Sequence, residues 1–400
     1  MIKKRISMYR KIRRNIASTS LLVVFITGFS YLLISCSGSN EMTRLHGRAG
    51  TLNNKIVTLQ DEIIKLQNEI TVLNEDIRRV GRKRYSMLFV GDILLANEAE
   101  LFIIKHGKNY PFEKIKDDLE DYDTVFGNLE TPISKRGKAV NNKPYVFEVS
   151  PKIASFLKKI KLDVVSISNN HIMDYGVKAM EDTMETLDDW DILYTGAGKN
   201  LKAARKPCII THGQTKVYIL AYCGRPPKDF YARKKKPGTA PLLFSYIQED
   251  IKKHKRKDTV VLVSLHWGIE QTRVPSTYQR NMAKRIITAG ADGIIGHHPH
   301  WPQGIEIYKG KPIIYSLGNF INGHYNKTEM NNIVAAFHYY GPKIEQVEIM
   351  CIAGKNRRVQ FQPYIFKGKE AKGNLEYIQR LSQKFGTKIK IEGYKGVIKL

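Results

Sequence analysis

Cysteine is scarce in this chain, with four among 400 residues, at Cys36, Cys208, Cys223 and Cys351. No two of them show Cys-x-x-Cys spacing, which argues against a cysteine zinc site and against a disulfide framework. Acidic residues are also few, 38 against 65 lysines and arginines, and the net charge is +27. Such a balance favours anionic partners. Because no nucleic-acid-binding motif occurs, we expect an acidic polymer or an anionic membrane and no nucleic acid.

Long hydrophobic runs are confined to the N-terminus. A basic segment leads into the run Leu21 to Ile34, which ends Leu33-Ile34-Ser35-Cys36. This order resembles a bacterial lipoprotein signal in which Cys36 becomes the lipidated first residue. An uncleaved signal anchor is the alternative, because the roughly nineteen residues from Ile16 can span a bilayer. Both interpretations predict that residues 1–36 attach the protein to the extracytoplasmic side of a bacterial membrane.

Residues 42–81 carry the most regular apolar pattern of the sequence. Ile, Leu and Val alternate there in steps of four and three residues, at Leu52, Ile56, Leu59, Ile63, Leu66, Ile70, Leu73, Ile77 and Val80. A helix lying on a globular domain keeps a 3.6-residue period, so its stripe would drift out of this register. Ile at one core position and Leu at the other favour a parallel two-stranded coiled coil, about 50 Å long. We therefore expect a stalk that makes the protein a homodimer.

Residues 85–400 alternate short β-branched and aromatic runs with helical stretches. The expected strands are 86–90, 124–126, 164–167, 217–222, 260–265, 293–295 and 313–317, and the expected helices include 151–159, 177–187 and 277–289. This alternation predicts an α/β core with buried strands. Residues 325–400 are expected to complete the domain with further strands and a helix. In such a core, ligands bind at the carboxyl ends of the strands.

Three histidines follow one of these strands, in Gly296-His297-His298-Pro299-His300. Their spacing indicates metal ligation, but His298 and His300 alone are too few, because a catalytic ion takes three or more protein ligands. Other strand ends carry further candidate ligands, namely Asp92, Glu130, Asn170 and His266, with His171 beside them. Each alone is equally typical of a turn or a helix cap. Together they form an oxygen and nitrogen set suited to Mn, Fe or Zn.

Several motifs resemble the CapA/PgsA family of poly-γ-glutamate capsule synthesis proteins, whose domain is similar to calcineurin-like metallophosphoesterases. They are Gly91-Asp92-Ile93-Leu94, Asn128-Leu129-Glu130-Thr131-Pro132, Asn169 to Gly176, Gly196 to Asn200, His266 to Glu270, and the block Gly290 to Phe320, which contains Tyr315-Ser316-Leu317-Gly318-Asn319-Phe320. The resemblance runs in order from about Ser86 to Leu381-Ser382. It implies a metallophosphoesterase-like β-sandwich flanked by helices, preceded by the anchor and the stalk, which lie outside it.

The resemblance also implies a ligand set for one or two divalent ions. One ion would have Asp92, Glu130 and His300 as ligands, and the other would have Glu130, Asn170, His266 and His298. The chain departs from the phosphoesterase pattern in two places. Leu94 replaces the histidine of an Asp-x-His motif, and Asn128 replaces a bridging aspartate, so that the bridge falls to Glu130. The first ion is therefore under-coordinated, and a single ion is a second possibility.

The remaining site residues have supporting roles in this interpretation. His171 would lie over the substrate as an acid or an electrostatic stabiliser. Asp174 and Glu270 would orient His171 and His266, although ordinary loop hydrogen bonding is the alternative for both. Asn128 and His297 are expected beside the ligands, contacting them or the substrate.

The resemblance implies a membrane-anchored, extracytoplasmic protein that takes part in the synthesis or export of an anionic capsule polymer similar to poly-γ-glutamate. Its expected partners are the membrane, the polymer and other capsule synthesis membrane proteins. Two alternatives stay open: a metal-dependent hydrolase, phosphoesterase or amidase, unrelated to capsule, and a scaffold without catalysis. Because Leu94 occupies a ligand position, the sequence leaves open whether the chain is an enzyme.

Overall fold

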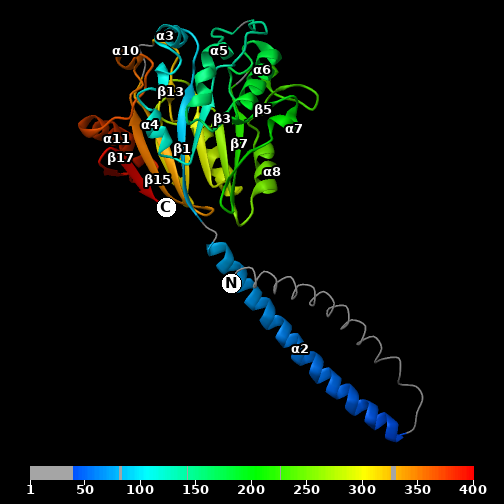
Figure 1. The fold of residues 1–400 in the computed structure, drawn as a ribbon. Coiled ribbons are helices and arrows are strands. Elements are labelled where there is room, and N and C mark those ends of the chain that lie inside the picture. The colour runs from blue at the N-terminus through cyan, green and yellow to red at the C-terminus, as the bar shows by residue number, and fades with distance from the viewer. Residues whose placement is uncertain (1–38, 81–82, 142, 226, 326–329) are drawn as a thin grey trace. The chain divides into compact units, whose positions relative to one another are not determined.

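The computed structural model describes residues 39–80, 83–141, 143–225, 227–325 and 330–400. The chain divides into two compact units, residues 1–80 and residues 81–400 (Figure 1). The expected lipoprotein signal or anchor, residues 1–36, lies outside the described residues. Across the described parts of the chain, no helix combines the length and the apolar character needed to cross a bilayer.

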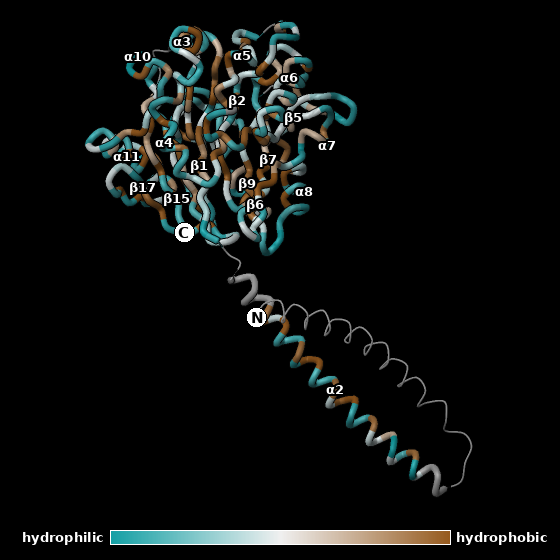
Figure 2. Tube along the Cα trace, in the orientation of Figure 1, coloured by the Kyte–Doolittle hydropathy of each residue, from teal (hydrophilic) through white to brown (hydrophobic). Residues whose placement is uncertain are grey.

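The first unit contributes one long helix, α2 (Ser39–Val80), of 42 residues. Its seam leucines are exposed in the single chain, with Leu52, Leu59 and Leu66 at 50%, 46% and 40% of their possible accessible surface. Apolar residues recur along the coloured part of this helix in Figure 2. An apolar stripe of this kind is stable in water when a second helix covers it. The helix expected from the sequence is thus present, and its pairing with a second copy stays a prediction.

The second unit is built on two large sheets and a small one. The first large sheet has the order β16 (Lys390–Glu392), β17 (Lys395–Lys399), β15 (Lys343–Ile352), β14 (Asn332–Tyr340), β1 (Arg84–Ile93), β2 (Thr124–Leu129), β3 (Val164–Ser166) and β4 (Leu193–Thr195), with β13 (Asn319–Ile321) also paired to β1. The second has the order β11 (Ile305–Tyr308), β12 (Lys311–Ile314), β10 (Gly293–His297), β9 (Thr259–His266), β7 (Thr215–Cys223) and β6 (Cys208–His212). The small sheet pairs β5 (Ala197–Gly198) with β8 (Gly238–Thr239). The strands β1 to β4 run parallel to one another, as do β7, β9, β10 and β12, so carboxyl ends gather at one edge of each sheet.

The helices of the second unit lie around the two sheets. They are α3 (Glu98–His106), α4 (Lys116–Glu120), α5 (Pro151–Ala154), α6 (Gly176–Asp189), α7 (Leu201–Ala204), α8 (Phe244–His254), α9 (Thr277–Thr288), α10 (Asn356–Val359) and α11 (Gly368–Gln383), with short 3-10 turns η1 (Tyr110–Phe112), η2 (Ser155–Lys159) and η3 (Lys228–Phe230). One of them, α11, adds Leu375 and Ile378 to the core between the sheets. The helix α9 begins with a capping box, in which Ser276 Oγ accepts from the Gln279 N–H at 3.2 Å and Gln279 Oε1 accepts from the Ser276 N–H at 3.0 Å. This cap fixes where α9 starts before the chain returns into β10.

The main core fills the space between the two large sheets. Phe89 and Phe337 from the first sheet and Leu262 and Ile295 from the second belong to one buried cluster. Alternate residues of β1, such as Leu88, belong to a different cluster on the opposite face. This two-residue alternation is what a strand buried on both faces requires. Truncating a fully buried ring such as Phe89 to alanine costs about 3–5 kcal/mol.

The prediction of a mixed α/β fold is confirmed. Each expected strand falls in one of the two large sheets, and the expected helices correspond to α5 with η2, to α6 and to α9. Residues 330–400 add β14 to β17 together with α11, as expected for the last part of the chain. One boundary differs, because β12 ends at Ile314 where a strand to Leu317 was expected. Beyond Ile314 the chain still runs close to β10: a Cβ at Gly296 would lie 2.0 Å from Tyr315 O, and the Leu317 N–H donates to Gly296 O at 3.2 Å.

Candidate metal centre

The carboxyl ends of strands from both large sheets carry the candidate ligands. Asp92 ends β1 beside Asn128 of β2, because the two residues are register partners. His266 and His297 are register partners in the same way at the ends of β9 and β10. Glu130 follows β2 and donates its backbone N–H to Ile93 O at 2.9 Å. The two sheets therefore bring carboxylates from one side and imidazoles from the other to a common place.

Asp92 is fully buried and is surrounded by donors. Its Oδ1 accepts from the Asn128 amide at 2.8 Å and lies 3.1 Å from His297 Nδ1. Its Oδ2 accepts from the His298 backbone N–H at 3.1 Å and lies 3.3 Å from His300 Nδ1. Burial opposes ionisation, but the hydrogen bonds from His297 and His300 hold the pKa of Asp92 well below its usual range. Asp92 is thus a fixed negative charge inside the protein.

Glu130 is also fully buried, and both of its carboxylate oxygens lack a hydrogen-bond partner. His266 Nε2 lies 3.2 Å from Oε1, but it is directed at Asn170 Oδ1, 2.8 Å away. The other oxygen lies 3.9 Å from His300 Nδ1. Burial, and then the negative charge of Asp92, raise the pKa of Glu130 well above its usual value. An unpaired buried carboxylate is costly, and a bound cation is one of the few groups that removes the cost.

His298 is the second group without partners. Both of its ring nitrogens are buried and unpaired, and its backbone has a φ of 93°, in a region that non-glycine residues rarely occupy. The ring lies 4.7 Å from that of His266. Burial, and then a neighbouring histidine, lower the pKa of both imidazoles well below their usual value; the neighbour is His300 for His298 and His298 for His266. Both are therefore neutral, which is the form that binds metal ions.

These unpaired atoms fit a divalent cation. Side-chain atoms able to bind a metal lie within 4.8 Å of one another in three groups, which are Asp92, Glu130 and His300; Glu130, His266 and His298; and Glu270, His298 and His300. We call the first group, Asp92, Glu130 and His300, the first position. The second position is Glu130, His266 and His298, together with Asn170, whose Oδ1 adjoins His266. When bound, a divalent cation in either position would polarise a phosphoryl or carbonyl oxygen as a Lewis acid.

His171 lies beside the second position with its ring held from behind. Its Nδ1 is 2.7 Å from Asp174 Oδ2, and Asp174 is fully buried. Lys143 forms an ion pair with the other oxygen of Asp174 and donates to Asn170 O at 2.7 Å. Burial lowers the pKa of His171 and that of Lys143. Because Asp174 engages Nδ1, the nitrogen left to exchange a proton with a substrate is Nε2.

Leu94 cannot contribute to the first position. Its side chain is buried and forms a small apolar cluster with Ala96 and Phe147. Phe147 in turn lies against the His171 ring, with 4.5 Å between ring centres. The place of the missing histidine is thus part of an apolar wall beside His171.

Glu270 is placed differently from the expectation. It is exposed, and it gathers with His298 and His300 instead of orienting His266. The described hydrogen bonds of the His266 ring go to Asn128, with 3.2 Å between Nδ1 and Nδ2, and to Asn170. Asn128, Asp174 and His297 all contact a candidate ligand or His171, as the contacts given above show.

Three polar residues of the centre received no role from the sequence. The Asn169 amide donates to Asn128 Oδ1 at 3.2 Å, and its own oxygen accepts from the His171 N–H at 3.1 Å. Asn319 Oδ1 lies 2.8 Å from His300 Nδ1. Asn169 and Asn319 belong to the motifs quoted above, so the sequence marked both residues but did not indicate what they do. Lys143 lies in a loop between β2 and β3, where one lysine among many gives no signal.

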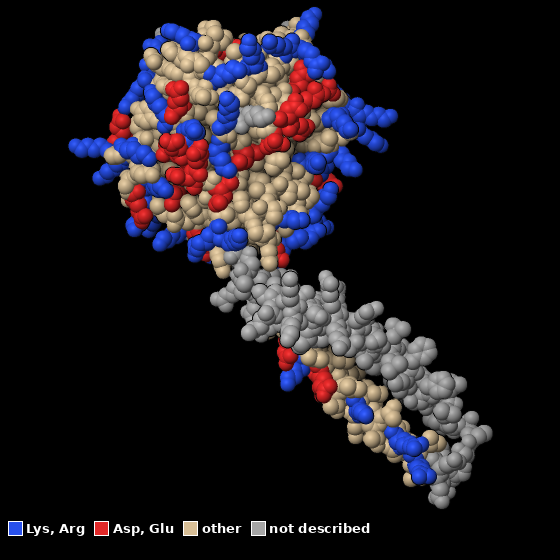
Figure 3. Space-filling view, in the orientation of Figure 1, with Lys and Arg blue, Asp and Glu red and all other residues tan. Residues whose placement is uncertain are grey.

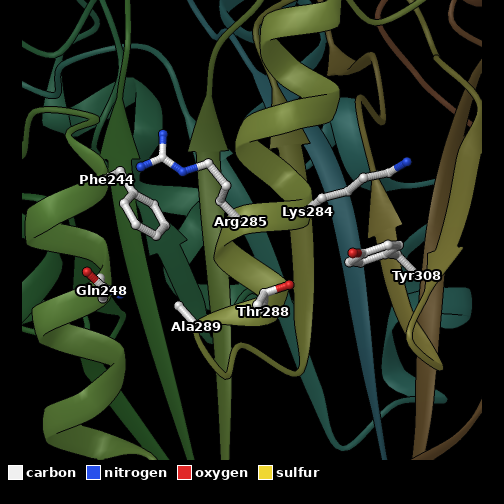
Figure 4. A pocket seen from close by; sticks show the side chains of 7 residues that line it. All are labelled: Phe244, Gln248, Lys284, Arg285, Thr288, Ala289 and Tyr308. Carbon is white, nitrogen blue, oxygen red and sulfur yellow. The ribbon is translucent and has the colours of Figure 1, made fainter.

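A separate hollow lies on the helical layer over the second sheet (Figure 4). Its volume is about 270 Å³, and its lining residues are Phe244, Gln248, Lys284, Arg285, Thr288, Ala289 and Tyr308. The guanidinium of Arg285 lies 3.9 Å from the centre of the Phe244 ring, and Lys284 Nζ lies 3.1 Å from Glu306 Oε1. No candidate metal ligand lines this basic groove, so it is independent of the metal centre.

Comparison with known proteins identifies the family. Residues 86–324 match the family described as bacterial capsule synthesis protein PGA_cap. The chain is 30% identical over 246 residues to the capsule biosynthesis protein CapA of Bacillus anthracis, covering 60% of each chain. It is 34% identical over 242 residues to the PGA biosynthesis protein CapA of Bacillus subtilis strain 168, covering 59% of this chain and 63% of that one. The chain thus spans about 60% of the length of these curated relatives.

Similar solved structures are more distant. A phosphatase from Mycoplasma pneumoniae shares 16% identity with a TM-score of 0.43, and the match covers 68% of this chain and 94% of that one. This likeness is too weak to carry an argument about activity. The family match extends over more than half of the chain and contains every candidate ligand of the centre. The chain therefore belongs to the PGA_cap family of bacterial capsule synthesis proteins.

Proposed function

We propose that the protein is a membrane-anchored, extracytoplasmic component in the synthesis or export of an anionic capsule polymer similar to poly-γ-glutamate, and that its metal centre takes part in this process. The observation that carries the proposal is the pair of unpaired buried groups, Glu130 and His298, at the meeting of the two sheets. Burying unpaired polar groups costs stability, and a bound cation would remove this cost. A carboxylate and an imidazole are also suitable ligands for such a cation.

The location and the partners in this proposal come from the sequence. Residues 1–36 have the pattern of a lipoprotein signal or a signal anchor, and the heptads of α2 favour a homodimeric stalk. The net charge of +27 favours a carboxylate polymer as the partner. Other membrane proteins of capsule synthesis would complete the assembly.

A metal-dependent hydrolase is a second candidate, favoured by the arrangement around His171. Its Nε2 is the free nitrogen of a ring that Asp174 orients, next to Asn170 of the second position. In such a reaction water would add to a phosphoryl or carbonyl centre, His171 Nε2 would take a proton from that water, and the same nitrogen would pass this proton to the leaving group. The bond cleaved would be a phosphoester or an amide.

Complementation of a deletion strain tests the proposal. Deleting the gene in the bacterium that encodes it should abolish the surface polymer, measured as glutamate released by acid hydrolysis of the capsule fraction. The wild-type gene should restore it, and His298→Ala should not, while Lys372→Glu, an exposed change on α11, should restore it fully. Unchanged surface polymer in the deletion strain would refute the role in capsule synthesis.

His171→Asn separates the hydrolase from the scaffold. A catalytic role predicts loss of polymer, and loss of model phosphodiester or amide hydrolysis, with metal content unchanged. Full restoration of polymer by His171→Asn, with no hydrolysis by the wild-type protein, would favour a scaffold.

A further inference from the structure

We propose that the side-chain oxygen of Asn319 is a ligand of the first position. It would take the place of the histidine of the Asp-x-His motif, where this chain has Leu94. The proposal rests on the metal centre of the proposed function and adds a residue to it. Without Asn319, the first position has one side-chain atom each from Asp92, Glu130 and His300. Leu94 is buried against Ala96 and Phe147 and has no donor atom.

The backbone places Asn319 directly beside Asp92. The strand β1 pairs with β14 as far as Phe89, and from Asp92 onward it pairs in parallel with β13. Asp92 and Asn319 are register partners there, and the Asp92 N–H donates to Gly318 O at 3.0 Å. This pairing requires glycine at position 91, because a Cβ there would lie 2.0 Å from Gly318 O. Gly91 thus allows β13 to come close enough to β1 to place Asn319 beside Asp92.

More oxygens surround His300 Nδ1 than a single hydrogen bond can serve. Three oxygens face this nitrogen: Asn319 Oδ1 at 2.8 Å, Asp92 Oδ2 at 3.3 Å and Glu130 Oε2 at 3.9 Å. The nitrogen carries at most one proton, which serves one acceptor well. Three oxygens and one nitrogen turned toward a common place form the hard and borderline ligand set of Mn, Fe or Zn. A neutral amide oxygen also adds a ligand without adding a third buried negative charge beside Asp92 and Glu130.

Metal stoichiometry of the purified full-length protein tests the proposal. Wild type, saturated with Mn²⁺ and measured by native mass spectrometry, should hold two ions per chain. Asn319→Ala should hold one at the same saturating concentration, because the second position keeps all of its ligands. Asn331→Ala is the matched control, since that asparagine bonds to Asn374 outside the centre and should leave two ions. The visible spectrum of the Co²⁺-loaded protein should change in Asn319→Ala, because the coordination of one ion is lost.

A role for Asn319 that only orients His300 makes a different prediction. Loss of an orienting contact weakens binding roughly 10–100-fold but leaves two ions at saturation. Two ions and a wild-type Co²⁺ spectrum in Asn319→Ala, or one ion in both wild type and Asn319→Ala, would overturn the proposal. Should Asn319→Ala fail to fold, Asn319→Asp decides, because a carboxylate ligand should keep two ions and lower the Kd of one of them roughly tenfold or more. An unchanged Kd in Asn319→Asp would count against ligation.

His298→Ala distinguishes failure of this proposal from failure of the centre itself. It should lose the second ion and keep the first. Wild type without bound metal, or full metal content in His298→Ala, would refute the metal centre as a whole. Loss of one ion in His298→Ala, with unchanged metal binding in both Asn319 variants, would refute only the assignment of Asn319.

Discussion

At the scale of single residues, Lys143 keeps the buried charge behind His171 in balance. Its side chain is 12% exposed and pairs with Asp174, which is not exposed at all. Asp174 also accepts from the Phe147 N–H at 2.8 Å. The loop that carries Lys143 and Phe147 is thus attached to the residue that orients His171, so one ion pair supports both the loop and the ring.

Replacing Lys143 by methionine should destabilise the protein by about 3–5 kcal/mol, because it removes the cation that neutralises the buried charge of Asp174. The free energy of unfolding in urea measures this change. Lys143→Met with Asp174→Asn should recover part of the loss, and Lys138→Met, an exposed lysine of the same loop, should stay within about 0.5 kcal/mol of wild type. Wild-type stability in Lys143→Met would contradict the structural role of the pair.

Removing single ligands should lower the amount of bound metal. His298→Ala and Asp92→Ala each take one ligand from a position that has few, and elemental analysis of the purified protein measures the result. His254→Ala is the control, because its ring stacks on Tyr218 outside the centre. Wild-type metal content in both ligand variants would show the assignment to be wrong.

The residues of the centre differ in how well the sequence predicts them. Asp92, His266 and His298 could be placed because each lies within three residues of the end of an apolar run, and parallel strands bring such positions to one edge. Lys143 and Asn319 depend on contacts between segments distant in the sequence. Loop closure around Asp174 and the extra strand beside β1 leave no periodic pattern that would reveal them.

At the scale of elements, three neighbouring strands of the first sheet share one buried carboxylate. Glu348 of β15 lies 3.3 Å from His338 Nε2 of β14 and 2.8 Å from Lys395 Nζ of β17. The His338 imidazole beside it, aided by Lys395 and opposed by burial, lowers the pKa of Glu348 from 4.5 to about 2. A carboxyl whose pKa is lower in the folded state stabilises the fold above its unfolded pKa, and this contribution is lost as the pH falls.

Glu348→Gln should therefore be less stable than wild type at pH 7. The difference should shrink as the pH falls from about 5 toward 2, because wild type loses the charged form in that window. Denaturant midpoints measured across this range give the difference directly. A gap between the two proteins that is constant from pH 7 to pH 2 would show that the charge of Glu348 is not its cause.

The helix α2 gives a prediction about assembly. A chain of residues 41–400 should sediment as a dimer, and Leu59→Glu with Leu66→Glu should sediment as a monomer, because charges would face each other in the apolar seam. Val57→Glu, an apolar residue outside the seam, should leave the dimer intact. Analytical ultracentrifugation measures the mass, and a monomeric chain of residues 41–400 would contradict the stalk.

The elements themselves were largely predictable from the sequence. Apolar runs in β1, β9 and β10 and the heptads of α2 have strong periods, which depend only on local sequence. The pairing of β13 with β1 was not predictable, because β13 has three residues and its partner is more than two hundred residues away. Such pairings follow from the packing of the whole sheet.

At the scale of the whole molecule, positive charge is spread over the surface of the second unit. On the face seen in Figure 3, lysines and arginines lie mainly along the margins, and acidic side chains gather in bands between them. Lys309 lies next to the basic groove, because its Nζ donates to Oγ1 of the lining residue Thr288 at 3.2 Å. Aromatic walls with cations between them suit the methylene groups and carboxylates of a polyglutamate chain.

We expect the protein to bind polyglutamate more weakly as the salt concentration rises, since salt screens exposed charges. Arg285→Glu with Lys309→Glu should weaken binding roughly tenfold, because exposed charge pairs contribute about 0.2–1 kcal/mol each and two are reversed. Arg357→Glu with Lys372→Glu changes the net charge equally at other exposed sites. Fluorescence anisotropy with labelled polymer measures the affinities, and equal losses in both double variants would show that only net charge matters.

The origin of the ligands in two different sheets has a consequence for folding. Asp92 and Glu130 come from the first sheet, and His266, His298 and His300 come from the second. An ion bound by both groups would connect the two sheets. At a free ion concentration 1,000 times the Kd, its binding would add about 4 kcal/mol to the free energy of unfolding. Loss of the ion would lower the free energy of unfolding by the same amount, so that the stability of the second unit would follow the supply of the ion.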